Sequence, residues 1–135
     1  MSKFVATDYQ ITIGGTDFTS SLASVSLDIE VDEQETTPFG STYRTRIGGL
    51  RNASATFDFH QDFATGSVDE TLFAALGTNV AVVVKPTSAA VSGTNPSYDF
   101  NCLVVQTQPF ANSVGDLATM SVTWPVDGAV TRTTS

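Results

Sequence analysis

The fold is decided by one alternating stretch, Ala53-Ser54-Ala55-Thr56-Phe57-Asp58-Phe59-His60. Every second residue in it is apolar, and the residues between are polar. Successive side chains of a β-strand point to opposite faces, so a period of two predicts a strand with one buried and one solvated face. We therefore expect a half-buried strand here.

The same period recurs along the chain in both directions. Between Ala23 and Val31 the odd-numbered residues are apolar and the even-numbered ones are Ser24, Ser26, Asp28 and Glu30. Further strands are expected over residues 9–13, which turn at a Gly-Gly pair, and over 98–104 and 118–124. The continuous apolar run at 80–84 predicts a central strand covered on both sides.

One short helix is expected at residues 67–76. It begins with a capping-box pattern, Ser67-Val68-Asp69-Glu70, in which the Ser67 hydroxyl accepts from the Glu70 backbone N–H. Leu72, Phe73 and Leu76 form its apolar face, and a glycine follows it. So short a helix is unstable alone and must pack on the sheets. We predict one mostly β domain over 1–135, a β-sandwich or partly closed barrel of six to eight strands with a flanking helix.

Charge is scarce and unevenly placed. The chain has 14 acidic and 6 basic residues, a net charge of −8. Such a surface repels phosphate backbones, so tight binding of nucleic acid is not expected. Acidic residues crowd the 23–31 strand and its end, whereas Arg44, Arg46 and Arg51 lie within eight positions of one another.

A long loop over residues 33–49 is predicted between the two strongest strands, and flexible arms at 1–7 and 130–135. The loop and the acidic strand are complementary in charge. Pairing between copies would give a head-to-tail contact that builds rings or filaments. Pairing within one chain would leave a solvated loop. The residues alone leave both possibilities open.

Catalytic and metal-binding patterns are not found in the sequence. The single histidine, His60, is expected on a solvated strand face, and the single cysteine, Cys102, in the core. Zinc needs more His or Cys ligands than these. Calcium between two carboxylates of the acidic strand is an alternative, although the usual loop pattern of calcium sites is absent. We therefore expect no enzyme, catalytic residue, metal or cofactor. With no signal-peptide or membrane-spanning pattern, a soluble cytoplasmic protein is expected.

Three segments carry a family resemblance: Thr37-Pro38-Phe39-Gly40-Ser41-Thr42-Tyr43-Arg44-Thr45-Arg46-Ile47-Gly48-Gly49-Leu50, the strand ending in Asp62-Phe63 with the helix after it, and the closing stretch at 115–125. In this order the chain resembles the tail tube (major tail) proteins of long-tailed bacteriophages, particularly small ones from phages of actinobacteria. The resemblance spans nearly the whole chain.

This resemblance implies a virion structural protein. Its subunits would form hexameric rings that stack into a hollow, non-contractile tail tube, through which double-stranded DNA passes without tight binding. Other partners would be the tape measure, terminator and distal tail proteins, and assembly would occur in the host bacterial cytoplasm. The alternatives are a head–tail connector or neck protein, a capsid decoration protein, and a monomeric β-sandwich binding module.

The resemblance also suggests site residues. The long loop of the family reaches an adjacent ring, and the candidates for contacts between rings or subunits here are Glu33, Glu35, Phe39, Tyr43, Arg44 and Arg46. A lumen that DNA must traverse is best lined by acidic and hydroxyl side chains, since each basic contact adds affinity for phosphate. The lumen candidates share polar strand faces: Ser24, Ser26, Asp28, Glu30, Thr56 and Asp58. In the competing interpretation these six residues cover the outside.

Overall fold

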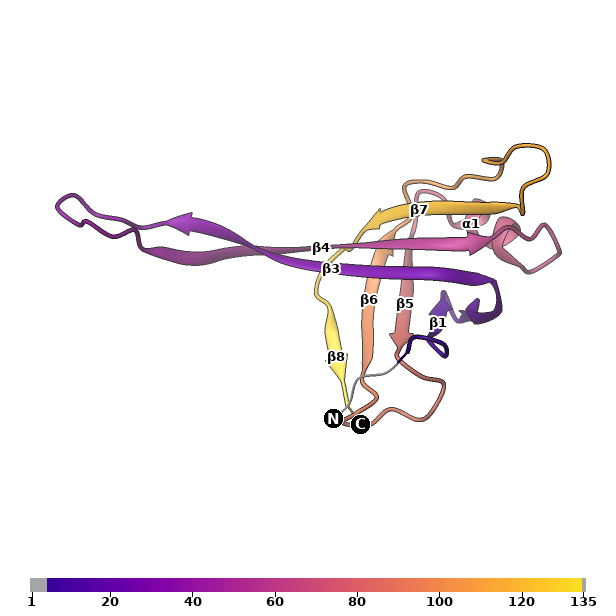
Figure 1. The fold of residues 1–135 in the computed structure, drawn as a ribbon, viewed down its shortest axis with the longest axis horizontal. Helices are drawn as coiled ribbons and strands as arrows, with labels where there is room; N and C mark the ends of the chain where they lie inside the picture. Colours follow the sequence, from indigo (N-terminus) through magenta and orange to yellow (C-terminus); the bar gives the residue numbers. More distant parts are fainter. Residues whose placement is uncertain (1–4, 135) are drawn as a thin grey trace.

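The computed structural model describes residues 5–134. Within these residues it has eight strands and one α-helix (Figure 1). The elements in chain order are β1 (Gln10–Ile13), β2 (Thr16–Asp17), a 3-10 turn (Thr19–Ser21), β3 (Leu22–Glu35), β4 (Arg46–His60), α1 (Val68–Ala75), β5 (Asn79–Lys85), β6 (Ser97–Leu103), β7 (Thr119–Pro125) and β8 (Thr131–Thr133).

The strands form two antiparallel sheets packed as a sandwich. The first sheet has the order β2-β1-β5-β6-β8, and the second has the order β3-β4-β7. In Figure 1 the strands of the two sheets cross instead of running alongside each other. The predicted mostly β fold with one short helix is therefore confirmed, as a sandwich and not as a closed barrel.

The core lies between the sheets and follows the predicted alternation. Ala55, Phe57 and Phe59 of β4 are fully buried, as are Val122 and Trp124 of β7. The first sheet and the helix complete the core with Ile11, Ile13, Val68, Leu72, Val82, Phe100 and Cys102. In β4 and β7, the face that the alternation predicts to be buried is thus the face that packs in the core.

The strand β5 is central in its sheet, as expected, but it is covered on one side only. Val82 is fully buried, whereas Ala81 is exposed. Its neighbour β6 behaves in the same way, because Leu103 is 36% exposed. The sandwich has two layers, so a strand in it has one core face however apolar its sequence is.

The helix α1 forms where it was predicted, but its start and its face differ. The Ser67 hydroxyl makes no capping bond; it donates to Asp62 Oδ2 at 2.8 Å, because a carboxylate is a strong acceptor. Val68 and Leu72 supply the buried face, while Phe73 is 69% exposed. The capping-box prediction was therefore wrong in its hydrogen bond.

The predicted loop over 33–49 is strand at both of its ends. β3 continues to Glu35 and β4 begins at Arg46, so only residues 36–45 lack a ladder. Gly48 and Gly49 suit close strand approach, since a Cβ on Gly48 would lie 3.2 Å from Val31 Cγ1. Backbone pairing needs no buried side chain. The ends of β3 and β4 therefore show no alternation of apolar and polar residues that would predict a strand.

The two expected arms have different outcomes. Thr131–Thr133 form β8 and pair with β6, so the C-terminal segment is part of the first sheet and not a free arm. Of the expected N-terminal arm, residues 1–4 lie outside the described residues, and residues 5–7 belong to no strand.

Candidate assembly surfaces

The most prominent surface is a projecting β-hairpin. The strand β7 pairs with β4 only from Ser54 to His60, so β3 and β4 beyond that point pair only with each other. We call residues 30–52 the hairpin arm. It extends well beyond both sheets (Figure 1). A two-stranded ribbon with no core of its own is only marginally stable in isolation.

The charged candidates of the arm pair across it. Arg46 Nε contacts Glu33 Oε1, and Arg44 Nε lies 3.5 Å from Glu35 Oε1. All four side chains are about half or more exposed. In the single chain the arginines therefore pair within their own hairpin, which was one of the two possibilities. Exposed pairs contribute only about 0–1 kcal/mol, so they can be exchanged for pairs with another subunit at little cost.

The tip of the arm is ordered and carries bare aromatic rings. Thr45 N–H donates to Thr37 Oγ1 at 2.9 Å, and the Ser41 hydroxyl donates to the Tyr43 carbonyl at 2.7 Å. Phe39 and Tyr43 are nevertheless almost fully exposed. Large apolar side chains held in an ordered position without cover are typical of an interaction site.

At the base of the arm and along it, sequence reasoning missed four exposed apolar residues. Ile29 and Val31 are each 50% exposed, and Ile47 and Leu50 are more exposed still. The only signal in the sequence was an apolar residue on either side of the Gly48-Gly49 pair. The first two had been assigned to a buried face, but the core ends before it reaches them.

The six lumen candidates lie together on one face of the second sheet. Ser24 pairs with Asp58 and Ser26 with Thr56, and the Thr56 hydroxyl lies 3.1 Å from that of Thr123 on β7. Along this face Asp28 and Glu30 of β3 continue the row. Within the described strands, the residues that share this face over 24–30, 52–60 and 119–125 include neither lysine nor arginine.

The second sheet ends in two edge strands, β3 and β7. An edge strand presents unpaired backbone groups and is a template for pairing with another chain. The β3 edge carries exposed acids, and a segment that follows β6 lies beside the β7 edge. The two edges of the second sheet therefore differ in charge and in cover.

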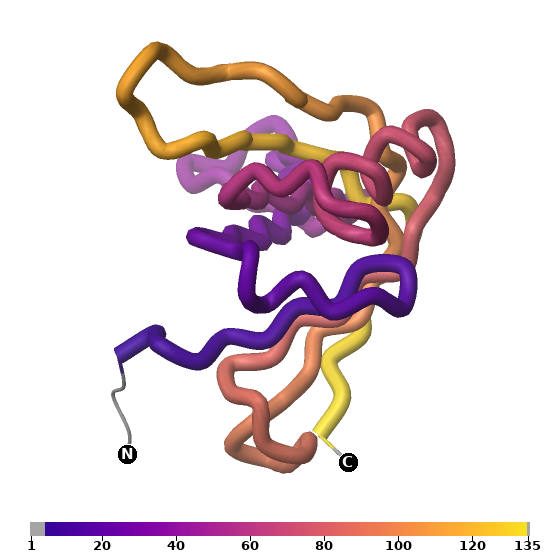
Figure 2. The backbone as a smooth tube through the Cα atoms, turned by 90° about the vertical axis from the view of Figure 1, so that its right-hand side faces the viewer, coloured from indigo at the N-terminus to yellow at the C-terminus, as the bar shows by residue number. Residues whose placement is uncertain are grey.

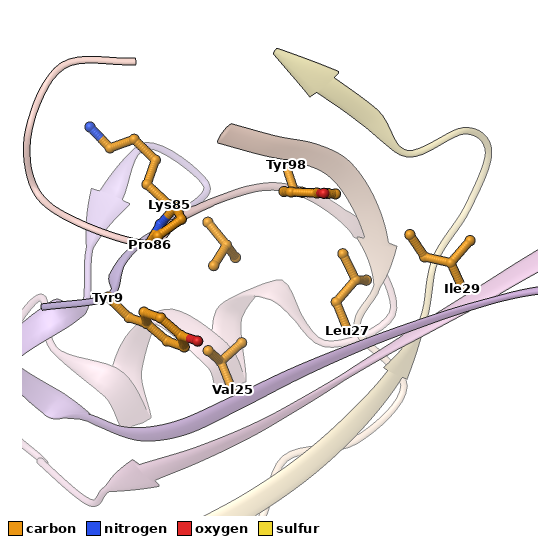
Figure 3. Close-up of a pocket in the computed structure, with 8 residues that line it drawn as sticks. Tyr9, Val25, Leu27, Ile29, Lys85, Pro86 and Tyr98 are labelled. Atoms are coloured by element: carbon orange, nitrogen blue, oxygen red, sulfur yellow. The ribbon is translucent and has the colours of Figure 1, made fainter. Parts of the chain in front are cut away.

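Where the sheets diverge, an apolar groove of about 400 Å³ opens between β3 and β5–β6. Figure 3 shows Val25, Leu27 and Ile29 facing Tyr98 and Tyr9 across it. Its lining has no carboxylate, histidine or cysteine, so no general acid–base pair or nucleophile converges there. The Tyr98 hydroxyl accepts a hydrogen bond from Arg132 Nε at 3.2 Å.

The remaining chemical candidates are isolated from one another. Burial raises the pKa of the Cys102 thiol to about 12, which leaves it protonated and unreactive at neutral pH. His60 is exposed at the end of β4. Among residues 5–134 no three His, Cys, Asp or Glu side chains gather in a way that could hold a metal ion. No helix in the same range could span a membrane.

Comparison with known proteins finds solved structures with the same fold. No protein-family model and no curated protein matches the chain. A solved structure of the virion of a native gene transfer agent particle contains a chain with a TM-score of 0.72 and 17% identity, over 97% of this chain and 99% of that one. The tail of an empty gene transfer agent particle, solved by helical refinement with C6 symmetry, gives a TM-score of 0.65 and 17% identity, over 93% of both chains.

The chain shares the fold of a gene transfer agent tail chain. The resemblance to phage tail proteins that the sequence suggested is thereby confirmed for the fold. The coverage is nearly complete in both directions, so the likeness includes the sandwich and its arm.

Proposed function

We propose that this protein is the subunit of a phage-type tail tube, a virion structural protein that assembles into stacked hexameric rings. The observation that carries the proposal is the shared fold over almost the whole chain with proteins of a gene transfer agent virion and of its C6-symmetric tail. Three surfaces support the proposal: the two edges of the second sheet, the hairpin arm and the polar face of the second sheet.

The two edges of the second sheet make the ring. The β3 edge of one copy pairs with the β7 edge of the next, and the contact repeats until the ring closes. Closure removes both exposed edges of the sheet. Six copies per ring would match the symmetry of the similar tail.

The hairpin arm makes the contact between rings. It reaches beyond the body of its own subunit, and its tip presents Phe39 and Tyr43 without cover. The rings of these two residues bury against the adjacent subunit. Glu33, Glu35, Arg44 and Arg46 exchange their pairs within the arm for pairs across the interface.

The polar face of the second sheet lines the bore. A closed ring of β3-β4-β7 sheets has an inside and an outside. One face of each sheet packs on the hydrophobic core, and the other carries Asp28, Glu30 and Asp58. We assign this second face to the inside. Carboxylates repel the phosphates of the passing duplex, and hydroxyls add no positive charge, so DNA moves through without being held. The protein works in the virion tail, together with tape measure, terminator and distal tail proteins.

Electron microscopy of the purified protein tests this function. At high concentration, and with a kosmotropic salt to strengthen apolar burial, we expect hollow filaments whose end-on views have sixfold symmetry. Rings that never stack would favour a connector or neck protein. A monomer that persists under all these conditions, with or without added tube fragments as seeds, would contradict the tube.

A further inference from the structure

The outer edge of β7 is already occupied in the single chain. Val126 N–H donates to the Ala53 carbonyl at 3.0 Å, which fixes the even-numbered amides of β7 toward β4. The amides of Thr119, Ser121 and Thr123 therefore point outward. They form the row that a further strand would pair with.

Side chains, not a strand, meet these outward amides. Ser121 N–H donates to Gln108 Oε1 at 3.2 Å, and Thr119 N–H donates to Asn112 Oδ1 at 3.1 Å. Both acceptors belong to residues 106–118, which we call the edge strap. Figure 2 shows the edge strap running beside β7 and bending back into it. It has no β-ladder to β7, so two side-chain amides stand in for a strand.

The edge strap is fastened lightly. Besides these bonds, the Gln106 carbonyl accepts from Trp124 Nε1 at 2.9 Å and the Pro109 carbonyl accepts from Gln61 Nε2 at 3.0 Å. Its apolar residues Phe110, Val114 and Leu117 are 70% or more exposed. Thr107 Oγ1 is buried without a hydrogen-bond partner, a cost that a tightly built segment would avoid.

Charge decides which strand fits the covered edge. If β3 paired with β3 of another copy, Asp28 and Glu30 would face like charges across the pair, which is unfavourable. Beside β7 the same carboxylates would meet the hydroxyls of Ser121 and Thr123. Acidic residues thus disfavour pairing between the β3 edges of two copies, and the edge strap covers the β7 edge.

We propose that the edge strap is a displaceable cap on β7, which keeps subunits from pairing until the β3 strand of a second copy replaces it. The proposal rests on the tail-tube function and adds a device that controls when the rings form. Displacement exchanges two side-chain bonds for a strand ladder and frees the exposed apolar residues of the edge strap for burial against a neighbour.

Weakening the edge strap should promote assembly. The double variant Gln108→Ala with Asn112→Ala loses both edge bonds and should assemble at a roughly tenfold lower protein concentration than the unaltered chain, measured by sedimentation. Asn101→Ala, the same truncation on an exposed position of β6, is the matched control and should assemble as the unaltered chain does.

Locking the edge strap should block assembly. Asn112 Nδ2 lies 3.3 Å from Thr119 Oγ1, so Asn112→Cys with Thr119→Cys puts two thiols on facing segments, and a disulfide between them would fasten the edge strap to β7. The oxidised protein should stay monomeric, and reduction should restore tubes. Asn112→Cys alone, treated with the same oxidant, controls for oxidation, because the native Cys102 is buried.

The possible outcomes separate the two proposals. If the oxidised variant, with its disulfide verified by mass spectrometry, forms tubes as readily as the reduced one, the cap is overturned while the tube function stands. An unchanged assembly concentration for the release variant would also overturn the cap. If no form assembles, the release variant and the reduced lock variant included, the tube function fails and the cap fails with it.

Discussion

The ring of Phe57 is held between two other aromatic rings and defines the centre of the core. Its centroid lies 5.3 Å from that of Trp124 and 5.9 Å from that of Phe59, and the side chain is fully buried. Phe57→Ala removes the ring and leaves a cavity, so we expect a loss of about 3–5 kcal/mol in the free energy of unfolding. Urea denaturation measures it. Phe73→Ala, at a 69% exposed position, should change it by less than about 0.5 kcal/mol.

A single carboxylate fastens the turn before α1. Asp62 accepts hydrogen bonds from Ala64 N–H and from the Ser67 hydroxyl, and these bonds lower the pKa of its carboxyl below the usual 3.8. A lowered folded-state pKa stabilises the fold above the unfolded value, and this contribution is lost as the pH falls through the folded value.

The variant Asp62→Asn tests this linkage. It should melt below the unaltered protein at pH 7, and the gap should close as the pH falls below about 3.8. Thermal melts followed by circular dichroism at several pH values measure the gap. Ser67→Ala, which removes one of the two donors, should show part of the same pH dependence. A gap that stays constant with pH would contradict the role of the charge.

The strands with a core-facing side could be predicted from sequence, and the arm could not. In β4 from Ala53 to Phe59 the core imposes a period of two, so the alternation identified the strand and its buried face. Beyond Asn52 no core exists, and Ile47 or Leu50 can be exposed on either face without a pattern. Backbone ladders alone hold that part, and side-chain periodicity does not report them.

The candidate surfaces were predictable to a similar extent. Strand parity alone indicated that the six lumen candidates lie on polar strand faces, and the pairing of Ser24 with Asp58 puts the polar faces of β3 and β4 on the same side of the sheet. The partners of Arg44 and Arg46 depend on the register between β3 and β4. The sequence does not give this register, because the arm has no alternation that would align the two strands. The bond from Ser67 to Asp62 was missed because a cap competes with any nearby carboxylate.

The hairpin arm gives an assembly prediction of its own. Replacing Arg44 and Arg46 together by glutamate puts four acidic side chains on the arm at the positions that pair now. The variant should remain a folded monomer, because exposed pairs contribute little to stability, but it should form no tubes. Circular dichroism checks the fold, and sedimentation with microscopy checks the tubes. Tubes of ordinary length would contradict a role of the arm between rings.

A charge-swapped arm separates repulsion within the hairpin from loss of contacts between subunits. The quadruple variant Glu33→Arg, Glu35→Arg, Arg44→Glu and Arg46→Glu restores both pairs within the arm with reversed polarity. If the arm meets charges on a neighbour, this variant should also fail to assemble alone. Recovery of normal tubes by the swap would show that only pairing within the hairpin matters.

At the scale of the entire chain, the proposed tube gives the acidic charge two uses. Six of the 14 acidic residues lie on β3 or on the neighbouring β4: Asp28, Glu30, Asp32, Glu33, Glu35 and Asp58. In that tube, the acids of the β3 edge would disfavour the pairing of like strands, and the polar face of the second sheet would present neither lysine nor arginine to a phosphate. A chain that binds DNA tightly needs the opposite distribution. A tube that conducts DNA needs repeated contacts between subunits and none with its cargo.

The last prediction tests whether the acidic face keeps the tube from binding the DNA that passes through it. Asp28→Lys with Glu30→Lys reverses the charge on the face assigned to the bore, in positions exposed in the single chain. Tubes should still form, because both side chains point away from the core, but each ring would present up to twelve lysines to the duplex if six copies close it. Each lysine–phosphate contact adds salt-dependent affinity, so DNA should be retained in the tube and ejection should slow, with the rate recovering as salt rises. Glu30→Lys alone should show part of the effect, and Glu70→Lys, the same charge change on α1, should show none. Ejection at the normal rate by the double variant, in particles with tubes of normal length, would place this face on the outside.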